Sequence, residues 1–418
     1  MQDRRNFLKL LLLSFITFGF SNKSLNPQSN FTMGKQVSNQ IKADLLAWDS
    51  IELHRTGTKG DQETGEWLAA EIQKINLKAE LDEITFIKRT PGRAEVSDGK
   101  NSIGGLPMFD GGSTEGKIIS EKAGFLNSDS PIGITDYNAN DRGEATKTLE
   151  EARKRNAHQI IVAVADVAPS VPGLAVLNAE AYNNPYGPPV LQVATQERAW
   201  LMEAAKNNST LTVSADLKDT KSTATNVQTI VNGRNKSLNP IVVMTPKSGW
   251  WTCTSERGGG ITVWLNALRH LANNQPERDV IFTANTGHEL SHIGLDHYLE
   301  KNAYLIKEAH AWIHLGANFA AKDGMLLWQT SNKNYMTAGL KALEDLSINE
   351  VAAMPVGQRA LGEARNIFDG GGEYISLLGS NPFFHHPNDR WPHSVDIAKL
   401  MKLNDMMLKM IGRLANEE

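Results

Sequence analysis

The sequence predicts an α/β fold, with a mainly parallel, mixed central sheet flanked by helices and a strand-rich domain inserted into it. Two buried strands, Pro240–Met244 and Asp279–Ala284, lie on either side of a helix, Gly258–Leu271. Alternation of buried strands with helices is typical of a layered α/β sheet. From about Pro91 to Leu217, short apolar runs instead alternate with Gly- and Pro-rich turns, which indicates a separate inserted block. Open α/β sheets place their sites at the carboxyl ends of the strands.

Length and charge narrow the class of protein. The 418 residues exceed one typical domain. Lys and Arg number 43 against 47 Asp and Glu, so the formal charge of −4 offers no electrostatic footprint for nucleic acid. One cysteine, Cys253, excludes a disulfide framework within the chain and any multi-cysteine metal site. A metal would therefore need nitrogen and oxygen ligands.

The N-terminus has the pattern of an export signal. Arg4 and Arg5 precede an almost wholly apolar run, Leu10–Phe20, which is too short to cross a bilayer stably. The paired arginines indicate a signal of the twin-arginine type, although an ordinary secretory signal or an uncleaved anchor fits the same run. We therefore expect residues 1–35 to be signal and linker, the twin-arginine export machinery to be a partner, the location to be periplasmic or secreted, and no stable membrane span in the mature chain.

The first folded segment reads as a helix followed by a strand. Around residues 64–72, Trp67 and Leu68 share a helical face with Ile72. Residues 81–86 then alternate between polar and apolar side chains, as a half-buried strand does.

Within the inserted block the predicted strands are short. They fall at residues 116–119, 132–134, 159–164 and 188–193, and one clear helix spans Lys147–Asn156. A third sequence pattern, in which buried strands alternate with helices, starts near residue 226.

Two elements complete the C-terminal part. Ile306–Leu315 is a candidate strand, and Ser394–Leu414 is an amphipathic closing helix. The expected domains are thus a catalytic-type domain, residues 36–90 and 218–418, and an insert, residues 91–217.

The first cluster of residues suited to catalysis or metal binding is a His-Glu-x-x-His motif. On a helix, His288 and His292 would share a face and bind zinc, with Glu289 as the base. The motif directly follows a strand and a glycine turn, which fits only in part the helical context that this class of zinc protease requires.

The second cluster follows strand Pro240–Met244 and opens the next helix. Glycines and free N–H groups at a helix start favour an anion, and Glu256 and Arg257 lie at this junction. A salt-bridged helix cap is the simpler interpretation. Trp250 and Trp251 would either pack in the core or form the wall of a ligand site.

The third cluster is the loop 381–389, where His385 and His386 stand next to Pro387 and near Asp389. It fits either a metal-ligand loop or a surface turn.

The order of these segments resembles the co-catalytic zinc aminopeptidase superfamily, which also contains the glutaminyl cyclases. Arg55–Asp61 followed by Thr64–Trp67 resembles its opening helix motif. Thr225–Val227 resembles the segment where the chain re-enters the catalytic domain, and the block between resembles a protease-associated insert domain. The resemblance covers nearly the whole chain after the signal.

Carried over residue by residue, the resemblance implies that one of two metals is lost. The family's His-x-Asp ligand motif falls on Thr245-Pro246-Lys247, and another Asp ligand falls on Gly316. Both positions belong to the same metal of the pair.

The other metal's positions are retained. The bridging Asp falls on Glu256, the second residue of a Glu-Glu pair on Glu289, and the last ligand on His385. His288 takes the place of the general base and Arg257 that of an Asn. Glutaminyl cyclases also keep a single-metal set, so the resemblance implies one zinc held by Glu256, Glu289 and His385.

Three functions stay open. In the first, the chain is an exported hydrolase of amide or peptide bonds: zinc polarises the carbonyl, His288 takes the proton, and Lys247, Trp250, Trp251 and Arg257 position a peptide or small-molecule substrate. In the second it is an inactive, metal-free periplasmic binding protein that uses the same cleft. In the third Cys253 is a nucleophile activated by a nearby base.

Overall fold

The computed structural model describes residues 27–139, 144–166 and 171–417, and the chain divides into two units, Met1–Gln40 and Ile41–Glu418. Of the first unit, residues 27–40 are described, and they form the start of helix α1 (Pro27–Asp49). The predicted export signal lies outside the described residues, whereas residues 27–35 of the expected linker belong to α1. None of the described helices is long and apolar enough to cross a membrane.

Parallel strands form the centre of the sheet in the second unit. Their order is β10-β9-β11-β14, with bounds Val280–Asn285, Ile241–Pro246, Ala311–Leu315 and Tyr374–Gly379. Their side chains are almost all buried, as expected for strands covered on both faces. Antiparallel strands extend the sheet on both sides, which confirms the predicted mainly parallel, mixed sheet. They are β8 (Thr210–Val231) beside β10 and β12 (Leu326–Thr330) beside β14, with β13 (Val351–Ala353) parallel beyond β12.

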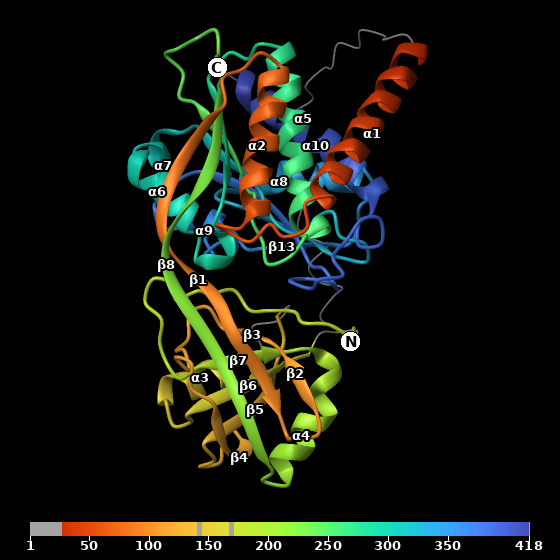
Figure 1. The fold of residues 1–418 in the computed structure, drawn as a ribbon. Helices are drawn as coiled ribbons and strands as arrows, with labels where there is room; N and C mark the ends of the chain where they lie inside the picture. The colour runs from red at the N-terminus through yellow and green to blue at the C-terminus, as the bar shows by residue number, and fades with distance from the viewer. Residues whose placement is uncertain (1–26, 140–143, 167–170, 418) are drawn as a thin grey trace. The chain divides into compact units, whose positions relative to one another are not determined.

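Helices cover this sheet. The helices α2 (Lys59–Lys74) and α5 (Gly259–Asn273) lie side by side (Figure 1), and Arg269 of α5 forms an ion pair with Glu71 of α2 at 2.8 Å. α10 (Ile397–Asn416) packs against α5, where Asn266 donates to Asn404 at 3.1 Å. The remaining helices outside the inserted block are α6 (Ile293–Lys301), α7 (Leu305–Glu308), α8 (Lys333–Asp345) and α9 (Ala364–Asp369).

The strands of the inserted block continue the same sheet through β8, and the block has a core of its own. Parallel strands β4-β5-β6-β7 span Ile119–Phe125, Ile132–Tyr137, Ile160–Ala165 and Val190–Val193. The short strands β2 (Ser102–Gly104) and β3 (Leu106–Pro107) and the helices α3 (Glu144–Arg155) and α4 (Arg198–Lys206) complete it. The strand expected at 116–119 begins three residues later, because Glu115 and Gly116 adopt positive φ values in a turn.

Two long strands carry the chain into and out of the insert. β1 (Glu80–Ser97) pairs antiparallel with β8 from Glu80↔Gln228 to Ser97↔Thr212, and the pair runs as one ribbon in Figure 1. The expected boundaries at residues 91 and 217 face each other in this ladder, at Pro91↔Leu217, next to an irregularity in the register. The insert is therefore joined to the rest by continuous strands.

One predicted strand is shorter than expected. The segment Ile306–Leu315 begins inside helix α7, and only residues 311–315 belong to β11. The apolar run is shared between a helical turn and a strand, which periodicity alone does not separate.

Candidate functional site

The predicted site residues follow the carboxyl ends of adjacent parallel strands. Glu256 follows β9, Glu289 follows β10, Gly316 follows β11 and His385 follows β14. This is where an open α/β sheet places its site.

Glu256 lies in a tight turn that Asp389 organises. Residues 254–258 form a π-helical turn after Cys253, whose φ is 51°. Asp389 accepts hydrogen bonds from the backbone N–H of Ser255 at 2.9 Å and of Glu256 at 3.0 Å. Burial raises the pKa of Asp389 to about 6. The turn therefore directs the Glu256 side chain by backbone hydrogen bonds to a buried carboxyl group.

Arg257 is the immediate partner of Glu256. Its Nη2 lies 2.8 Å from Glu256 Oε1, and both side chains are completely buried. Arg257 Nε donates to the Ser248 carbonyl at 2.9 Å, whereas Nη1 and Nη2 have no well-oriented hydrogen-bond acceptor in the described part of the chain. Burial alone would raise the pKa of Glu256, but the Arg257 charge and His385 outweigh it and lower the pKa to about 2. Glu256 is thus an ionised carboxylate paired with a buried guanidinium.

His385 is close to Glu256, but Glu289 is held elsewhere. His385 Nε2 lies 3.5 Å from Glu256 Oε1, and its Nδ1 is 2.7 Å from the Val176 carbonyl. The Glu289 carboxylate instead accepts from the Thr56 N–H and from Ser248 Oγ, each at 2.7 Å.

These residues do not fit a zinc ion. A zinc site needs nitrogen or oxygen ligands converging at about 2.0–2.2 Å. Across residues 27–139, 144–166 and 171–417, no group of three or more His, Cys, Asp or Glu side chains is arranged to hold a metal. The guanidinium of Arg257 lies against the carboxylate that a metal would need. The geometry therefore gives no support to the zinc set Glu256, Glu289 and His385 expected from the resemblance.

The residues at the ligand positions of the second metal bond to other protein groups. Thr245 Oγ1 donates to the Leu315 carbonyl at 2.8 Å. Lys247 is completely buried, forms an ion pair with Asp61, and donates to the Asp61 carbonyl at 3.0 Å. Lys247 is therefore occupied by Asp61 and does not project into a cleft as a substrate ligand.

Gly316 has no room for the carboxylate that the family places there. A Cβ on Gly316 would lie 2.3 Å from Leu378 Cδ2 and 2.6 Å from His314 Cε1. His314 is completely buried, and its Nδ1 hydrogen-bonds with Ser376 Oγ at 2.9 Å. The imidazole of His314 therefore occupies the space beside the lost ligand.

Three buried carboxylates of the site face a cation from the chain. Glu256 faces Arg257 and Asp61 faces Lys247. Glu289 interacts with Arg55. Burial lowers the pKa of Arg55, and the negative charge of Glu289 opposes this effect by raising it. Buried carboxylates need such compensation, whether from a metal or from side chains. Here basic side chains provide it.

The His-Glu-x-x-His motif is not helical. His288–Leu290 form a 3₁₀ turn, Ser291 and His292 adopt positive φ values, and α6 begins only at Ile293. The two imidazoles stack with centroids 4.7 Å apart. The helical zinc-protease interpretation of this motif is therefore wrong, because its two histidines do not lie one helical turn apart.

His288 has an unexpected partner, Glu363. His288 Nδ1 lies 3.4 Å from Glu363 Oε1, and both side chains are buried. Burial, reinforced by the charge of Arg257, holds the pKa of His288 well below its usual range, while burial raises the pKa of Glu363 to about 8. Both groups are thus uncharged at neutral pH. No motif surrounds Glu363 in the sequence, so sequence reasoning missed it.

The remaining predicted residues are packed into the structure. Trp250 is buried and donates to Asn178 Oδ1 at 3.0 Å, and Trp251 donates to the His385 carbonyl at 2.9 Å. Burial and nearby carboxylates raise the pKa of Cys253, so its thiol stays protonated. A protonated thiol does not fit the nucleophile hypothesis.

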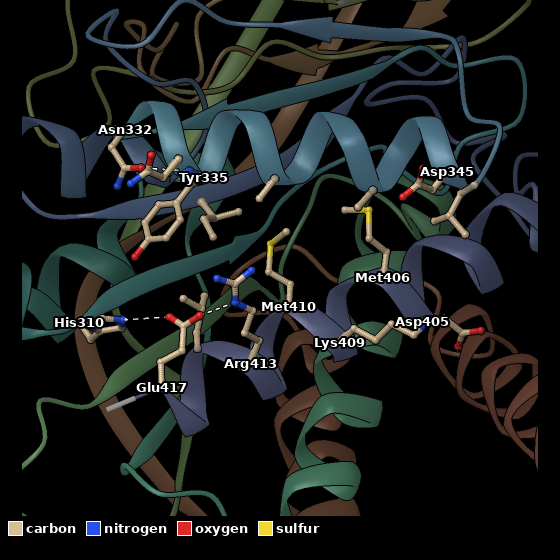
Figure 2. Close-up of a pocket in the computed structure, with 16 residues that line it drawn as sticks. His310, Asn332, Tyr335, Asp345, Asp405, Met406, Lys409, Met410, Arg413 and Glu417 are labelled. Carbon is tan, nitrogen blue, oxygen red and sulfur yellow. Dashed lines mark hydrogen bonds and ion pairs between the residues drawn. The ribbon is translucent and has the colours of Figure 1, made fainter. Parts of the chain in front are cut away.

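A separate hollow lies between α8 and α10. Its volume is about 590 Å³. Figure 2 shows side chains of the two helices pointing toward one another across it, with Tyr335 and His310 at one end and Asp345 at the other. None of the predicted site residues lines it.

The steric argument at Gly316 predicts the effect of restoring the family's residue. Gly316→Asp should lower the free energy of unfolding by about 3 kcal/mol or more, because the new side chain is overpacked and its charge is buried. Urea unfolding measures this. Gly412→Asp is the matched control, since a Cβ there meets no atom within 4 Å, and it should change the stability by about 1 kcal/mol or less. Unchanged stability of Gly316→Asp would contradict the packing described for this position.

The raised pKa of Glu363 predicts a pH dependence. The folded state keeps a proton up to about pH 8 that the unfolded state releases near pH 4.5, so the free energy of unfolding falls as pH rises through this window. Glu363→Gln removes this loss. Its stability relative to the native chain should increase by up to about 4 kcal/mol between about pH 5 and pH 8. Urea unfolding at several pH values tests this, with exposed Glu344→Gln as the control. A constant difference would refute a neutral Glu363.

Comparison with known proteins defines the fold. No protein-family model matches the chain, and no curated protein matches it. Solved structures do match. A zinc aminopeptidase from Bacillus subtilis superposes with a TM-score of 0.72 and 15% identity, over 92% of this chain and 95% of that one. A peptidase M28 precursor from Shewanella amazonensis gives 0.71 and 14%, over 94% and 98%. An aminopeptidase from Aneurinibacillus gives 0.67 and 14%, over 92% and 94%. The chain therefore has an aminopeptidase-like peptidase fold.

Proposed function

We propose that this chain is an exported, metal-independent binding protein built on the aminopeptidase-like fold. The buried ion pair between Arg257 and Glu256 at 2.8 Å carries the proposal. A guanidinium in contact with the carboxylate neutralises it and opposes a second cation at the same place. The paired arginines before the apolar run at the N-terminus support export.

The consequence for chemistry is the loss of a strong electrophile. Zinc, when bound in a peptidase site, polarises a carbonyl and generates a nucleophilic water near neutral pH. Arg257 offers hydrogen bonds and a fixed charge, but it does not lower the pKa of a coordinated water. The lowered pKa of His288 makes its neutral imidazole a weak base, and Glu363 is protonated at neutral pH, so neither is a strong proton acceptor.

The ligand is expected in the cleft that the resemblance implies at the carboxyl ends of the parallel strands. The similar structures are aminopeptidases, and a peptide or peptide-like small molecule is the class that such a cleft accommodates. Trp251 is half-buried, and the Arg257 nitrogens, although completely buried, have no well-oriented acceptor and would donate to a ligand that reaches the site. The insert, residues 91–217, would act as a protease-associated-like domain beside the cleft.

A second candidate is the one-zinc hydrolase of amide or peptide bonds. The 3.5 Å separation of His385 Nε2 and Glu256 Oε1 favours it, because two of its three ligands are already close. In this candidate, Arg257 would have to leave Glu256 before a metal binds.

Metal analysis separates the two candidates. The purified full chain is incubated with zinc, and unbound zinc is removed by gel filtration. Inductively coupled plasma mass spectrometry should then find well below one zinc ion per chain. His385→Ala should leave that value unchanged. One zinc ion per chain that His385→Ala removes would overturn the binding-protein proposal and establish the hydrolase as the better candidate.

The ion pair also predicts a stability effect. Arg257→Asn introduces the residue that the resemblance places here and leaves Glu256 as an uncompensated buried charge. It should lower the free energy of unfolding by about 3–5 kcal/mol in urea unfolding. The control Arg234→Asn breaks an exposed pair with Glu277 and should cost about 0–1 kcal/mol. Equal effects of the two variants would mean that the buried pair is not needed for charge compensation.

A further inference from the structure

One segment of the insert enters the site. Residues 174–182, here called the closing segment, lie between β6 and β7 and belong to no strand. The Val176 N–H donates to the His385 carbonyl at 3.4 Å, and the Ala179 N–H donates to the Glu289 carbonyl at 2.9 Å. Asn178 Oδ1 accepts from Trp250. The segment thus contacts three predicted site residues at once.

Successive residues of the closing segment face opposite sides. Val176 and Asn178 bond to the site, as described above. Leu177 N–H donates to Gln192 of the insert at 2.9 Å, and the Ala175 carbonyl accepts from Tyr137 of the insert. Extended chain alternates its side chains and bonding groups in this way. The closing segment therefore joins the insert to the site along its length.

The insert holds its side of the segment by the chain connection between β6 and β7 and by polar contacts. The Ala181 N–H donates to Asp110 at 3.1 Å, and Asp110 itself pairs with the buried Arg153 at 2.9 Å. On the site side, His385 Nδ1 lies 2.7 Å from the Val176 carbonyl, Trp250 donates to Asn178, and Arg365 of α9 pairs with Glu180 at 3.0 Å. Val176 and Ala179 also pack in one apolar cluster with Trp250. Because the segment connects two strands of the insert, it stays with the insert when contacts break, and separation is expected on the site side.

The site residues beneath the closing segment are buried. His385 is 2% exposed and Glu256 is completely buried, so a ligand has no direct path to them. We propose that the closing segment is an intramolecular cover, which detaches from the site while it stays attached to the insert. This inference rests on the proposed function, because it assumes that a ligand enters the cleft.

The single cysteine provides a probe. Cys253 is completely buried in the same turn as Glu256, so its reaction with N-ethylmaleimide reports opening of the site. Asn178→Ala removes the acceptor of the Trp250 bond and should speed labelling of the folded full chain at least tenfold. Asn178→Asp keeps an acceptor oxygen and should remain near the native rate, as should exposed Asn184→Ala in the same connection. Equal rates for all four proteins would overturn the proposal.

Hydrogen exchange tests which side opens. In Asn178→Ala, the amides of Val176 and Ala179 should lose protection at least tenfold, whereas those of Leu177 and Ala181, which bond to the insert, should not. Uniform loss at all four amides, or none, would overturn the proposal.

If Asn178→Ala does not fold, the native chain suffices. A local cover predicts that labelling of Cys253 depends only weakly on urea below the unfolding transition, because little surface is exposed. Labelling with the full urea dependence of global unfolding would overturn it. These measurements use no metal, so a zinc ion found by metal analysis would refute the proposed function and leave the result on the cover standing.

Discussion

The buried contact between Arg257 and Glu256 is the interaction on which the character of this site depends. A carboxylate without solvent needs a compensating charge, and a zinc ion or a basic side chain can supply it. The cation here is covalently part of the chain, so compensation does not depend on a metal supply. Asp389 fixes the turn that carries both residues, because it accepts hydrogen bonds from the backbone N–H groups of Ser255 and Glu256.

The other substitutions follow the same physical logic. Asp61 is a second buried carboxylate, and Lys247 compensates its charge. At Gly316 the opposite applies, because no carboxylate is present and His314, a neutral side chain, takes up the volume. Charge and volume are therefore both balanced without an ion. This agreement between independent positions is more informative than the loss of any one ligand.

The sequence was sufficient to predict the central sheet and to show which of the family's metal-ligand positions carry other residues. Buried strands such as Ile241–Pro246 are read from apolar runs, and Thr245 and Gly316 are visible as substitutions. The pairing of Arg257 with Glu256 was not predictable, because it depends on side-chain directions within a π-helical turn. Local backbone also misled the prediction at His292, where a positive φ replaces the expected helix. A short motif specifies residue types, whereas the geometry comes from tertiary packing.

The ladder between β1 and β8 limits how the covered site can open. These strands pass from one part of the chain to the other, paired from Glu80↔Gln228 to Ser97↔Thr212 with one irregularity between Pro91 and Ala94. A hinge between insert and sheet would have to bend or break this ladder, whose backbone groups would then lose their partners. Detachment of residues 174–182 breaks a few contacts and leaves the ladder intact. Local release is therefore the lower-energy route, and the fixed insert limits how far the detached segment can move.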